Sequence, residues 1–400
     1  MSRLRQFGLW LVLAVIAILA LLLGVSLQSK RMARRLATQA APQPARGDVL
    51  FRQKGCVACH GTHASDVRQI PSASSLPRLV STMWNHAPRM WEAMRSRGIS
   101  YPSLDYEEAG QLVSYLYFSG HSDPEGNPEH GRDLFVEKRC AACHAIGKDG
   151  HKGGPDLSQL SPPETPIEWA QGLWNHAADM QTRMAAQRIS WPTFQPGEVR
   201  DLLAYVRQQG QPKAAGDPAI GDPSRGWQVF QDKGCTRCHE PSAQPEHIAP
   251  AFGAGKLLPP TYSEFGQAML NHFPQMQQAL TSQGSLAPKF ASHEMLDLAV
   301  FLYSLNYQEP TGSPLVGASV FQWRGCAACH GAEAEGTVSV PPLRGRGVTF
   351  TATRLAADLW RHGVRMQEQN RALGQPWPSL QERDIGDLLS FLNTPLESSH

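Results

Sequence analysis

Apolar positions in this chain recur at helical spacing, and the same arrangement appears four times along the sequence. A short pattern, Gly-x-x-Leu/Val-Phe, predicts an amphipathic helix in each copy because its apolar residues lie three and four positions apart. The copies are Gly47–Phe51, Gly131–Phe135, Gly226–Phe230 and Gly317–Phe321. No strand pattern competes with these helices, so we expect an all-α fold.

A second apolar helix ends each copy. Its most regular part is found at Leu112–Leu116, Leu202–Val206, Leu298–Leu302 and Leu388–Leu392. One aromatic residue recurs at the same position in all four, as Tyr115, Tyr205, Phe301 and Phe391. We expect this ring to pack against the Phe of the first helix and so close the unit.

Stretches rich in Gly, Pro and polar residues separate the copies, which is typical of linkers. They are residues 119–130, 211–225 and 306–316. Self-similarity at this period indicates a tandem array of small domains. The expected domains are residues 45–119, 128–210, 223–306 and 315–395, hereafter repeats 1 to 4.

The N-terminal region has a different character. Residues 7–27 carry no charge, and Ser26 is their one polar side chain. This length matches the roughly 20 residues that span a bilayer, whereas the apolar core of a secretory signal is usually about 7–15 residues. We expect residues 1–35 to form a membrane anchor with basic flanks, and a removed signal peptide is the alternative.

Charge narrows the choice of partners. The formal net charge is +2, but residues 1–35 hold six basic side chains and no acidic one. The remainder therefore has 31 basic against 35 acidic side chains. No basic patch is interleaved with aromatics, so we expect no nucleic-acid binding. The acidic balance suits a partner with a basic docking face, and it equally suits ordinary solubility.

All eight cysteines belong to four Cys-x-x-Cys-His motifs, one after each first helix. The motifs are Cys56-x-x-Cys59-His60, Cys140-x-x-Cys143-His144, Cys235-x-x-Cys238-His239 and Cys326-x-x-Cys329-His330. This pattern is typical of covalent attachment of c-type haem, with the His as the proximal iron ligand. A redox disulfide does not explain a His four times, and zinc needs ligands from nearby segments. We therefore expect four haem c groups.

Taken together, each unit resembles a class I cytochrome c domain: a first helix, a Cys-x-x-Cys-His loop, middle helices, and a last helix with Tyr or Phe. The resemblance covers nearly all of the chain after residue 45. It implies one-electron chemistry at iron, with a haem edge exposed to partners. It also implies a Pro whose carbonyl accepts the ring N–H of the proximal His. The residues at the matching offset are Pro71, Pro155, Pro250 and Pro341.

The sixth iron ligand departs from the family pattern, which places Met just before a Pro ahead of the last helix. That position here holds Tyr101, Trp191, Ala287 and Trp377. A second repeated motif reads Trp-Asn-His-x-x-x-Met, with Leu270 in place of the third Trp and Arg361 in place of the fourth Asn. It offers a His and a Met four positions apart, on one helix face. The preferred set is Met90, Met180, Met276 and Met366, and the alternative set is His86, His176, His272 and His362. Met ligation would raise the reduction potential.

These features predict an electron carrier rather than an enzyme. Four haems would relay single electrons between a membrane oxidoreductase and periplasmic redox proteins. The alternatives are a peroxidase or small-oxyanion reductase with a labile ligand, and a cytochrome subunit of a larger respiratory or photosynthetic membrane complex. The positive-inside rule alone would place the chain after the anchor in the cytoplasm. Attachment of c-type haem places it instead in the periplasm of a bacterium, on a single-pass anchor in the cytoplasmic membrane.

Overall fold

A computed structural model describes residues 42–61, 75–151, 153–160, 163, 165–210, 219–239, 249, 252 and 258–396. The expected anchor at residues 1–35 lies outside the described residues. From Gln43 onward the chain forms one compact unit. None of the described helices is both long and apolar enough to cross a bilayer.

The helices predicted at the start and end of each repeat are present. The first helices are α2 (Pro44–Gln53), α7 (Pro128–Glu137), α11 (Pro223–Asp232) and α14 (Pro314–Trp323). The last helices are α6 (Tyr106–Ser119), α10 (Glu198–Gln209), α13 (Glu294–Ser304) and α17 (Glu382–Asn393). Every first helix begins at a Pro, whose fixed φ suits the first turn.

First and last helices pack against each other within each repeat, through the expected rings. The centroid distances are 5.3 Å for Phe51–Tyr115, 5.9 Å for Phe135–Tyr205, 5.6 Å for Phe230–Phe301 and 5.3 Å for Phe321–Phe391. The prediction that these rings meet is confirmed. The motif's Gly allows the approach, because a Cβ at Gly131 would collide with the carbonyl oxygen of Asp201. Gly47, Gly226 and Gly317 stand in the same relation to the last helix of their own repeats.

A long helix lies between these two in each repeat and carries the second motif. In repeats 1, 3 and 4 it is continuous, as α5 (Leu76–Ser96), α12 (Tyr262–Ser282) and α16 (Ala352–Ala372). In repeat 2 it is divided at His176 into α8 (Pro166–Asn175) and α9 (Ala177–Ala186). A Ser or Thr caps the start of each: Ser75, Thr165, Thr261 and Thr351.

The remaining described elements are short. They are α3 (Val57–His60), α15 (Ala327–His330), and the 3-10 helices η1 (Cys140–Ala142), η2 (Leu157–Gln159) and η3 (Cys235–Arg237). Two antiparallel two-residue strands, β1 (Ala145–Ile146) and β2 (Asp149–Gly150), pair in repeat 2. The described part is therefore helix-rich, as expected for an all-α fold.

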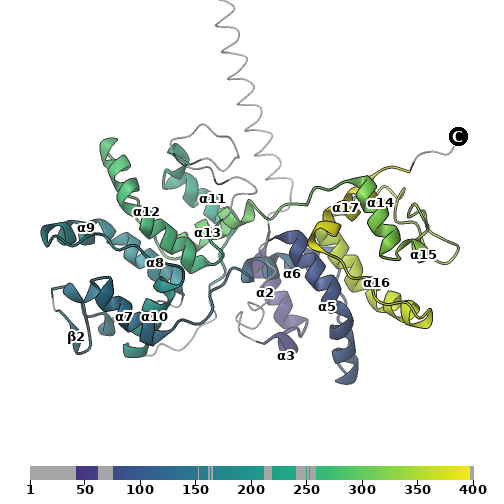
Figure 1. Ribbon diagram of the computed structural model, residues 1–400, viewed down its shortest axis with the longest axis horizontal. Helices are drawn as coiled ribbons and strands as arrows, with labels where there is room; N and C mark the ends of the chain where they lie inside the picture. The colour runs from purple at the N-terminus through teal and green to yellow at the C-terminus, as the bar shows by residue number, and fades with distance from the viewer. Residues whose placement is uncertain are drawn as a thin grey trace, which may run out of the picture. The chain divides into compact units, whose positions relative to one another are not determined.

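The repeats do not pack in sequence order. Helix α5 of repeat 1 packs against α16 and α17 of repeat 4, and α8 of repeat 2 packs against α12 and α13 of repeat 3. In Figure 1 the purple-blue α5 accordingly lies beside the yellow-green α16, while α8 lies beside α12. Apolar periodicity within each repeat does not predict these partners.

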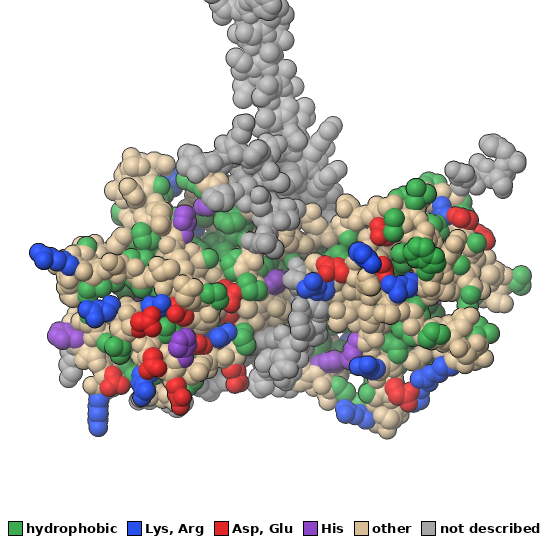
Figure 2. All heavy atoms as spheres, in the orientation of Figure 1, with side chains coloured by type: hydrophobic (Ala, Val, Ile, Leu, Met, Phe, Trp, Pro, Cys, Tyr) green, Lys and Arg blue, Asp and Glu red, His purple; other side chains and the backbone are tan. Residues whose placement is uncertain are grey.

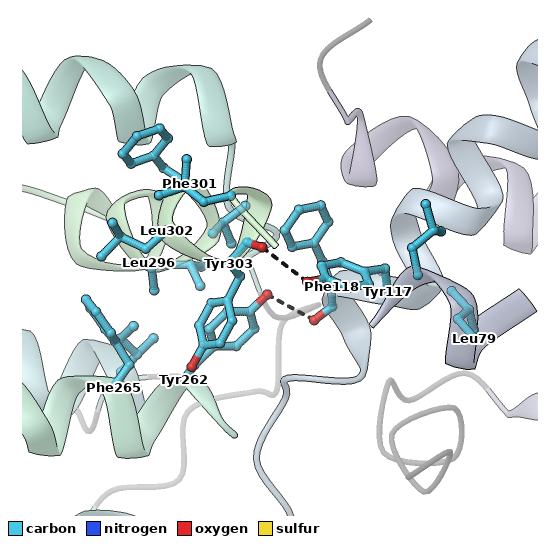
Figure 3. Packing of buried hydrophobic residues seen from close by; sticks show 14 of the residues in the cluster. Leu79, Tyr117, Phe118, Tyr262, Phe265, Leu296, Phe301, Leu302 and Tyr303 are labelled. Atoms are coloured by element: carbon cyan, nitrogen blue, oxygen red, sulfur yellow. Dashed lines mark hydrogen bonds between the residues drawn. The ribbon is translucent and has the colours of Figure 1, made fainter. Parts of the chain in front are cut away.

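An aromatic cluster joins repeats 1 and 3 (Figure 3). The hydroxyl of Tyr117 donates to the carbonyl oxygen of Tyr303 at 3.1 Å, and that of Tyr262 donates to the carbonyl oxygen of Phe118 at 2.9 Å. The ring of His121 stacks on Tyr303 with centroids 4.1 Å apart. All five side chains are buried, and the hydroxyls of Tyr117 and Tyr262 find their hydrogen-bond partners inside the protein.

Candidate functional site

Each Cys-x-x-Cys-His motif folds as one tight turn after the first helix. In every motif the backbone N–H of the His donates to the carbonyl of the first Cys, at 2.8–3.0 Å. Residues three and four apart share a face in such a turn, so both thiols and the imidazole point to the same side. All eight cysteines are free of disulfides.

The turn requires a left-handed residue immediately before the first Cys. Glycine fills that position in three repeats, as Gly55 (φ 78°), Gly234 (φ 74°) and Gly325 (φ 81°). Repeat 2 has Arg139 there, with φ 66°. A non-glycine residue in this region is strained, and the loop holds it in place nonetheless.

A basic residue two positions before each motif ties the loop to the start of the last helix. The ion pairs are Lys54–Glu108 (2.6 Å), Lys138–Glu198 (2.8 Å), Lys233–Glu294 (2.7 Å) and Arg324–Asp384 (2.8 Å). The basic position is visible in the sequence, but its acidic partner lies 54 to 61 positions later. These pairs fix the loop relative to both helices that flank it.

A second His faces the motif His. The imidazole centroids of His60 and His86 lie 6.0 Å apart, and those of His239 and His272 lie 6.5 Å apart. Because a metal–imidazole nitrogen bond is about 2 Å long and the ring centroid lies roughly 1 Å beyond the nitrogen, two axial imidazoles on one metal have centroids about 6 Å apart. The donor set and its spacing therefore fit one iron between the rings.

The other two repeats show the same relation electrostatically. Burial lowers the pKa of His330, and the nearby His362 lowers it further. Partial desolvation of the ring also lowers the pKa of His176, and His144 acts in the same direction, whereas a hydrogen bond to the backbone of Gly172 opposes both. Unprotonated imidazoles are the form that binds a metal, so these environments suit ligands.

The four candidate Met residues are arranged differently. Met90, Met180, Met276 and Met366 are half-buried, and all but Met180 pack against the hydrophobic core. Of the four candidate His residues, His86, His272 and His362 are exposed on the same helices, and His176 is exposed at the break between α8 and α9. In the two repeats with measured ring contacts, a member of the alternative set, His86 or His272, thus lies opposite the motif His.

The expected Pro contact is present in repeat 2, where Nδ1 of His144 lies 3.1 Å from the carbonyl oxygen of Pro155. In repeat 4 the buried Nδ1 of His330 has no hydrogen-bond partner among the described residues, so Pro341 does not supply one there. Pro71 and Pro250 lie outside the described residues.

The competing uses of the cysteine pairs find little support. Burial raises the pKa of Cys140, Cys235 and Cys326 to about 11, whereas a reactive redox thiol needs a lowered pKa. In the described ranges no three His, Cys, Asp or Glu side chains converge as a metal-binding group, as a structural zinc site would require.

Helical repeats with paired thiols and a His on one face, opposed by a second His, resemble the haem sites of c-type cytochromes. Comparison with known proteins agrees. Residues 128–210 and 316–395 match the family model described as "Cytochrome c". These segments correspond to repeats 2 and 4. The matches support a c-type cytochrome with covalently bound haem and haem-based electron transfer.

Two relatives share part of the chain. One is described as "Cbb3-type cytochrome c oxidase subunit FixP" from Sinorhizobium medicae, 28% identical over 184 residues, which are 44% of this chain and 60% of that protein. Another is a "Cytochrome c" from Gossypium barbadense, 24% identical over 103 residues, covering 21% of this chain and 92% of the relative. The chain thus spans less than two thirds of the FixP length. No solved structure matches.

Proposed function

We propose that the protein is a four-haem electron carrier, with one haem c in each repeat. The observation that carries this proposal is the fourfold recurrence of the Cys-x-x-Cys-His turn, which a second His faces in the two repeats with measured ring contacts. Covalently bound haem would supply one-electron chemistry at iron. The chain's own residues would fix that group through Cys56, Cys59 and their six counterparts, and orient it through His60, His144, His239 and His330.

For the sixth iron ligand, the geometry favours the alternative set of His residues over the Met residues. Centroid separations of 6.0 and 6.5 Å between facing imidazoles support His86 and His272 as distal ligands. By the repeat, His176 and His362 take the same role. Met90, Met180, Met276 and Met366 would then pack beside the ring without binding iron.

The test has two parts. Intact mass and a haem assay should give four haem c groups per chain. The oxidised spectrum should lack the near-red sulfur-to-iron band. His176→Ala should convert about a quarter of the iron to a high-spin form, whereas Met180→Ala should leave it low-spin. A near-red band that disappears in Met180→Ala would restore Met as the ligand in repeat 2, and fewer than four haems would end the four-haem proposal.

The proposed setting is the periplasmic side of a bacterial cytoplasmic membrane, with residues 1–35 as the anchor. Its partners would be a membrane oxidoreductase and periplasmic redox proteins. On the face drawn in Figure 2, acidic and basic side chains are interspersed rather than gathered into one patch. That mixture suits brief docking with redox partners better than binding to a polyanion.

A second candidate is a cytochrome subunit of a larger oxidase complex, favoured by the similarity to FixP. Gentle solubilisation of membranes followed by affinity purification distinguishes the two. A free carrier should elute without stoichiometric membrane subunits, whereas a subunit should bring a fixed set of them. An enzyme with an open iron would instead show high-spin spectra in one redox state.

A further inference from the structure

The residues around the distal His candidates bond across to another repeat. In α8, the indole N–H of Trp174 donates to the carbonyl of Pro288 at 2.7 Å. The next residue, Asn175, donates to the carbonyl of Phe290 at 2.7 Å and accepts from its backbone N–H at 2.8 Å. Both acceptors lie in the loop of repeat 3 that leads to its last helix. The Trp-Asn half of the motif therefore contacts a partner repeat, and the following residue is His176.

The contact is reciprocal. Asn271 of α12 makes the same two bonds to Phe194 of repeat 2, both at 2.8 Å. Repeats 1 and 4 repeat the scheme, with Trp84 bonded to Pro378, Asn85 bonded twice to Leu380, and Trp360 bonded to Pro102. Asn85, Asn175 and Asn271, which directly precede distal His candidates, thus bond to the backbone of the partner repeat. At the fourth such position, Arg361 of repeat 4 makes no such backbone bond and lies over the ring of Tyr106 of repeat 1 instead.

The residues that precede the loop Pro also have a use in this contact. The indole N–H of Trp191 donates to the carbonyl of Leu270 at 3.0 Å, and that of Trp377 donates to the carbonyl of Trp84 at 3.1 Å. Pro274 and Pro88 follow these carbonyls by four positions in the same helices. Because Pro has no N–H, the helix cannot use either carbonyl internally, and the partner's indole occupies it.

We infer that the repeats work as two nested couples, repeat 1 with repeat 4 and repeat 2 with repeat 3. In each couple, donors from one repeat position the distal-His helix of the other. The residue that accepts the partner's indole lies two positions before His272 or His86. Trp191 and Trp377 are thus positioning residues for a site in another repeat. This inference rests on the proposed function for the role of those histidines.

The first experiment tests the couples. A protease site inserted within residues 211–218 divides the purified, haem-loaded chain into repeats 1–2 and repeats 3–4. Both couples cross this cut, so the halves should co-elute. Asn175→Ala with Asn271→Ala and Asn85→Ala should release them. Halves that separate on cutting with their haems attached, or that stay together in the triple variant, would overturn the couples.

Two controls isolate the interface. Asn393→Ala removes the same pair of backbone bonds, to Phe350 at 2.7 and 2.8 Å, but inside repeat 4. Tyr262→Phe removes the hydroxyl that bonds repeat 3 to repeat 1 in the aromatic cluster. Neither variant should release the halves. Release by Tyr262→Phe alone would assign the association to the cluster and contradict the inference.

The second experiment tests positioning. Trp191→Phe keeps the aromatic bulk and removes the N–H, so it should raise the high-spin fraction through His272 in repeat 3. That increase should vanish in a His272→Ala background and persist in a His176→Ala background, because coupled residues are non-additive. Trp169→Phe is the control, since its buried indole N–H has no partner among the described residues.

The opposite pattern, with the Trp191→Phe effect lost in the His176→Ala background, would place its influence within repeat 2. If Trp191→Phe changed the spectrum in neither background, Trp191 would be a packing residue only, and the positioning role would be wrong. The haem count is measured on the same samples. A chain with fewer than four haems contradicts the proposed function, whereas four haems with the wrong pattern contradict only the couples.

Discussion

The interface of repeats 2 and 3 and the interface of repeats 1 and 4 are built from the same Trp and Asn anchors, and each lacks a different one. Between repeats 2 and 3, both Asn side chains bond twice to the partner, but Leu270 replaces one Trp. Between repeats 1 and 4, both Trp side chains donate to the partner, but Arg361 replaces one Asn. Each interface therefore retains three of its four anchors. Close packing and backbone bonds thus substitute for one another at these positions.

The substitutions are compensated locally. Arg361 lies over the ring of Tyr106 at 4.8 Å, and Arg354 lies over the same ring at 4.2 Å. The hydroxyl of Tyr106 donates to Asp358 at 2.7 Å. Where Leu270 replaces Trp, the ring of Phe273 stands against Trp174 and Trp191, with centroids 5.1 and 5.4 Å away. Cation–π contacts support one interface, and ring packing supports the other.

Removing a buried Trp should have the largest effect on stability and should differ most between the two interfaces. Trp174 is 2% exposed, so Trp174→Ala should lower the free energy of unfolding by about 3–5 kcal/mol. Trp360→Ala should cost less because its ring is only half-buried. Denaturant unfolding measures both, and Trp323→Ala serves as the control because that ring is 82% exposed. Equal losses at Trp174 and Trp360 would show that burial does not set the difference.

Acidification should destabilise the aromatic cluster between repeats 1 and 3, and it should not distinguish the interface of repeats 1 and 4 from that of repeats 2 and 3. Burial lowers the pKa of His121 from 6.5 to about 4. Between these pH values the unfolded chain binds a proton that the folded chain does not. The free energy of unfolding therefore decreases by about 3 kcal/mol in total as the pH is lowered from above 6.5 to below 4. Burial raises the pKa of neighbouring Asp123, which opposes this trend.

The measurement is the unfolding midpoint between pH 7 and pH 4. His121→Phe keeps a ring on Tyr303 and should flatten the decline. Tyr106→Phe, at the interface of repeats 1 and 4, should leave the slope unchanged. A decline of the same size in His121→Phe would exclude His121 as its source.

The Asn anchors should give intermediate effects. Asn85→Ala leaves the backbone N–H and carbonyl of Leu380 without their side-chain partner, which should cost about 1–3 kcal/mol. Arg361→Asn supplies the missing fourth anchor but removes the contact with Tyr106, so we expect a net change below about 1 kcal/mol. Chemical unfolding of the two variants and their combination measures both. A large gain from Arg361→Asn would show that the cation–π contact is not the compensation.

The smallest effect should come from the ion pair at the edge of the same interface. Arg78 and Glu382 lie 2.9 Å apart, with side chains 49% and 41% exposed. Arg78→Ala should change stability by less than about 1 kcal/mol, and less still at high salt. Thermal unfolding at two ionic strengths measures this. A loss as large as that of Asn85→Ala would mean that surface charge, not backbone bonding, holds repeats 1 and 4.

Much of each repeat could be predicted from sequence because its signals are local. The first helix and the cysteine turn recur at fixed spacing, a last helix follows in every repeat, and the Phe–Tyr or Phe–Phe contact follows from apolar periodicity. The basic residue before each motif was visible, but its acidic partner was not. A single sequence orders elements along the chain and does not identify which distant faces meet.

The pairing of repeat 1 with repeat 4 and of repeat 2 with repeat 3 could not be predicted either, because it also depends on which distant faces meet. Trp174 and Asn175 stand next to His176, so the sequence associates them with the iron site, although their bonds run to another repeat. The sequence pattern shows that Trp191 and Trp377, which precede the loop Pro, cannot bind iron, but it does not show that their indole N–H groups bond to another repeat. One signal was available: Pro88 and Pro274 each leave a helix carbonyl without its internal N–H, and such a carbonyl needs an outside donor.

Nesting also sets an order for biogenesis. Asn85 and Leu380, which bond across the outer couple, are 295 positions apart. At about 5–20 residues per second, the ribosome needs roughly 15–60 s to make the stretch between them. During that interval the apolar faces of Trp84 and Trp91 await a surface not yet synthesised. A chain that stops before repeat 4 should therefore leave repeat 1 without its partner and prone to aggregation. Repeats 2 and 3 can already pack against each other in such a chain.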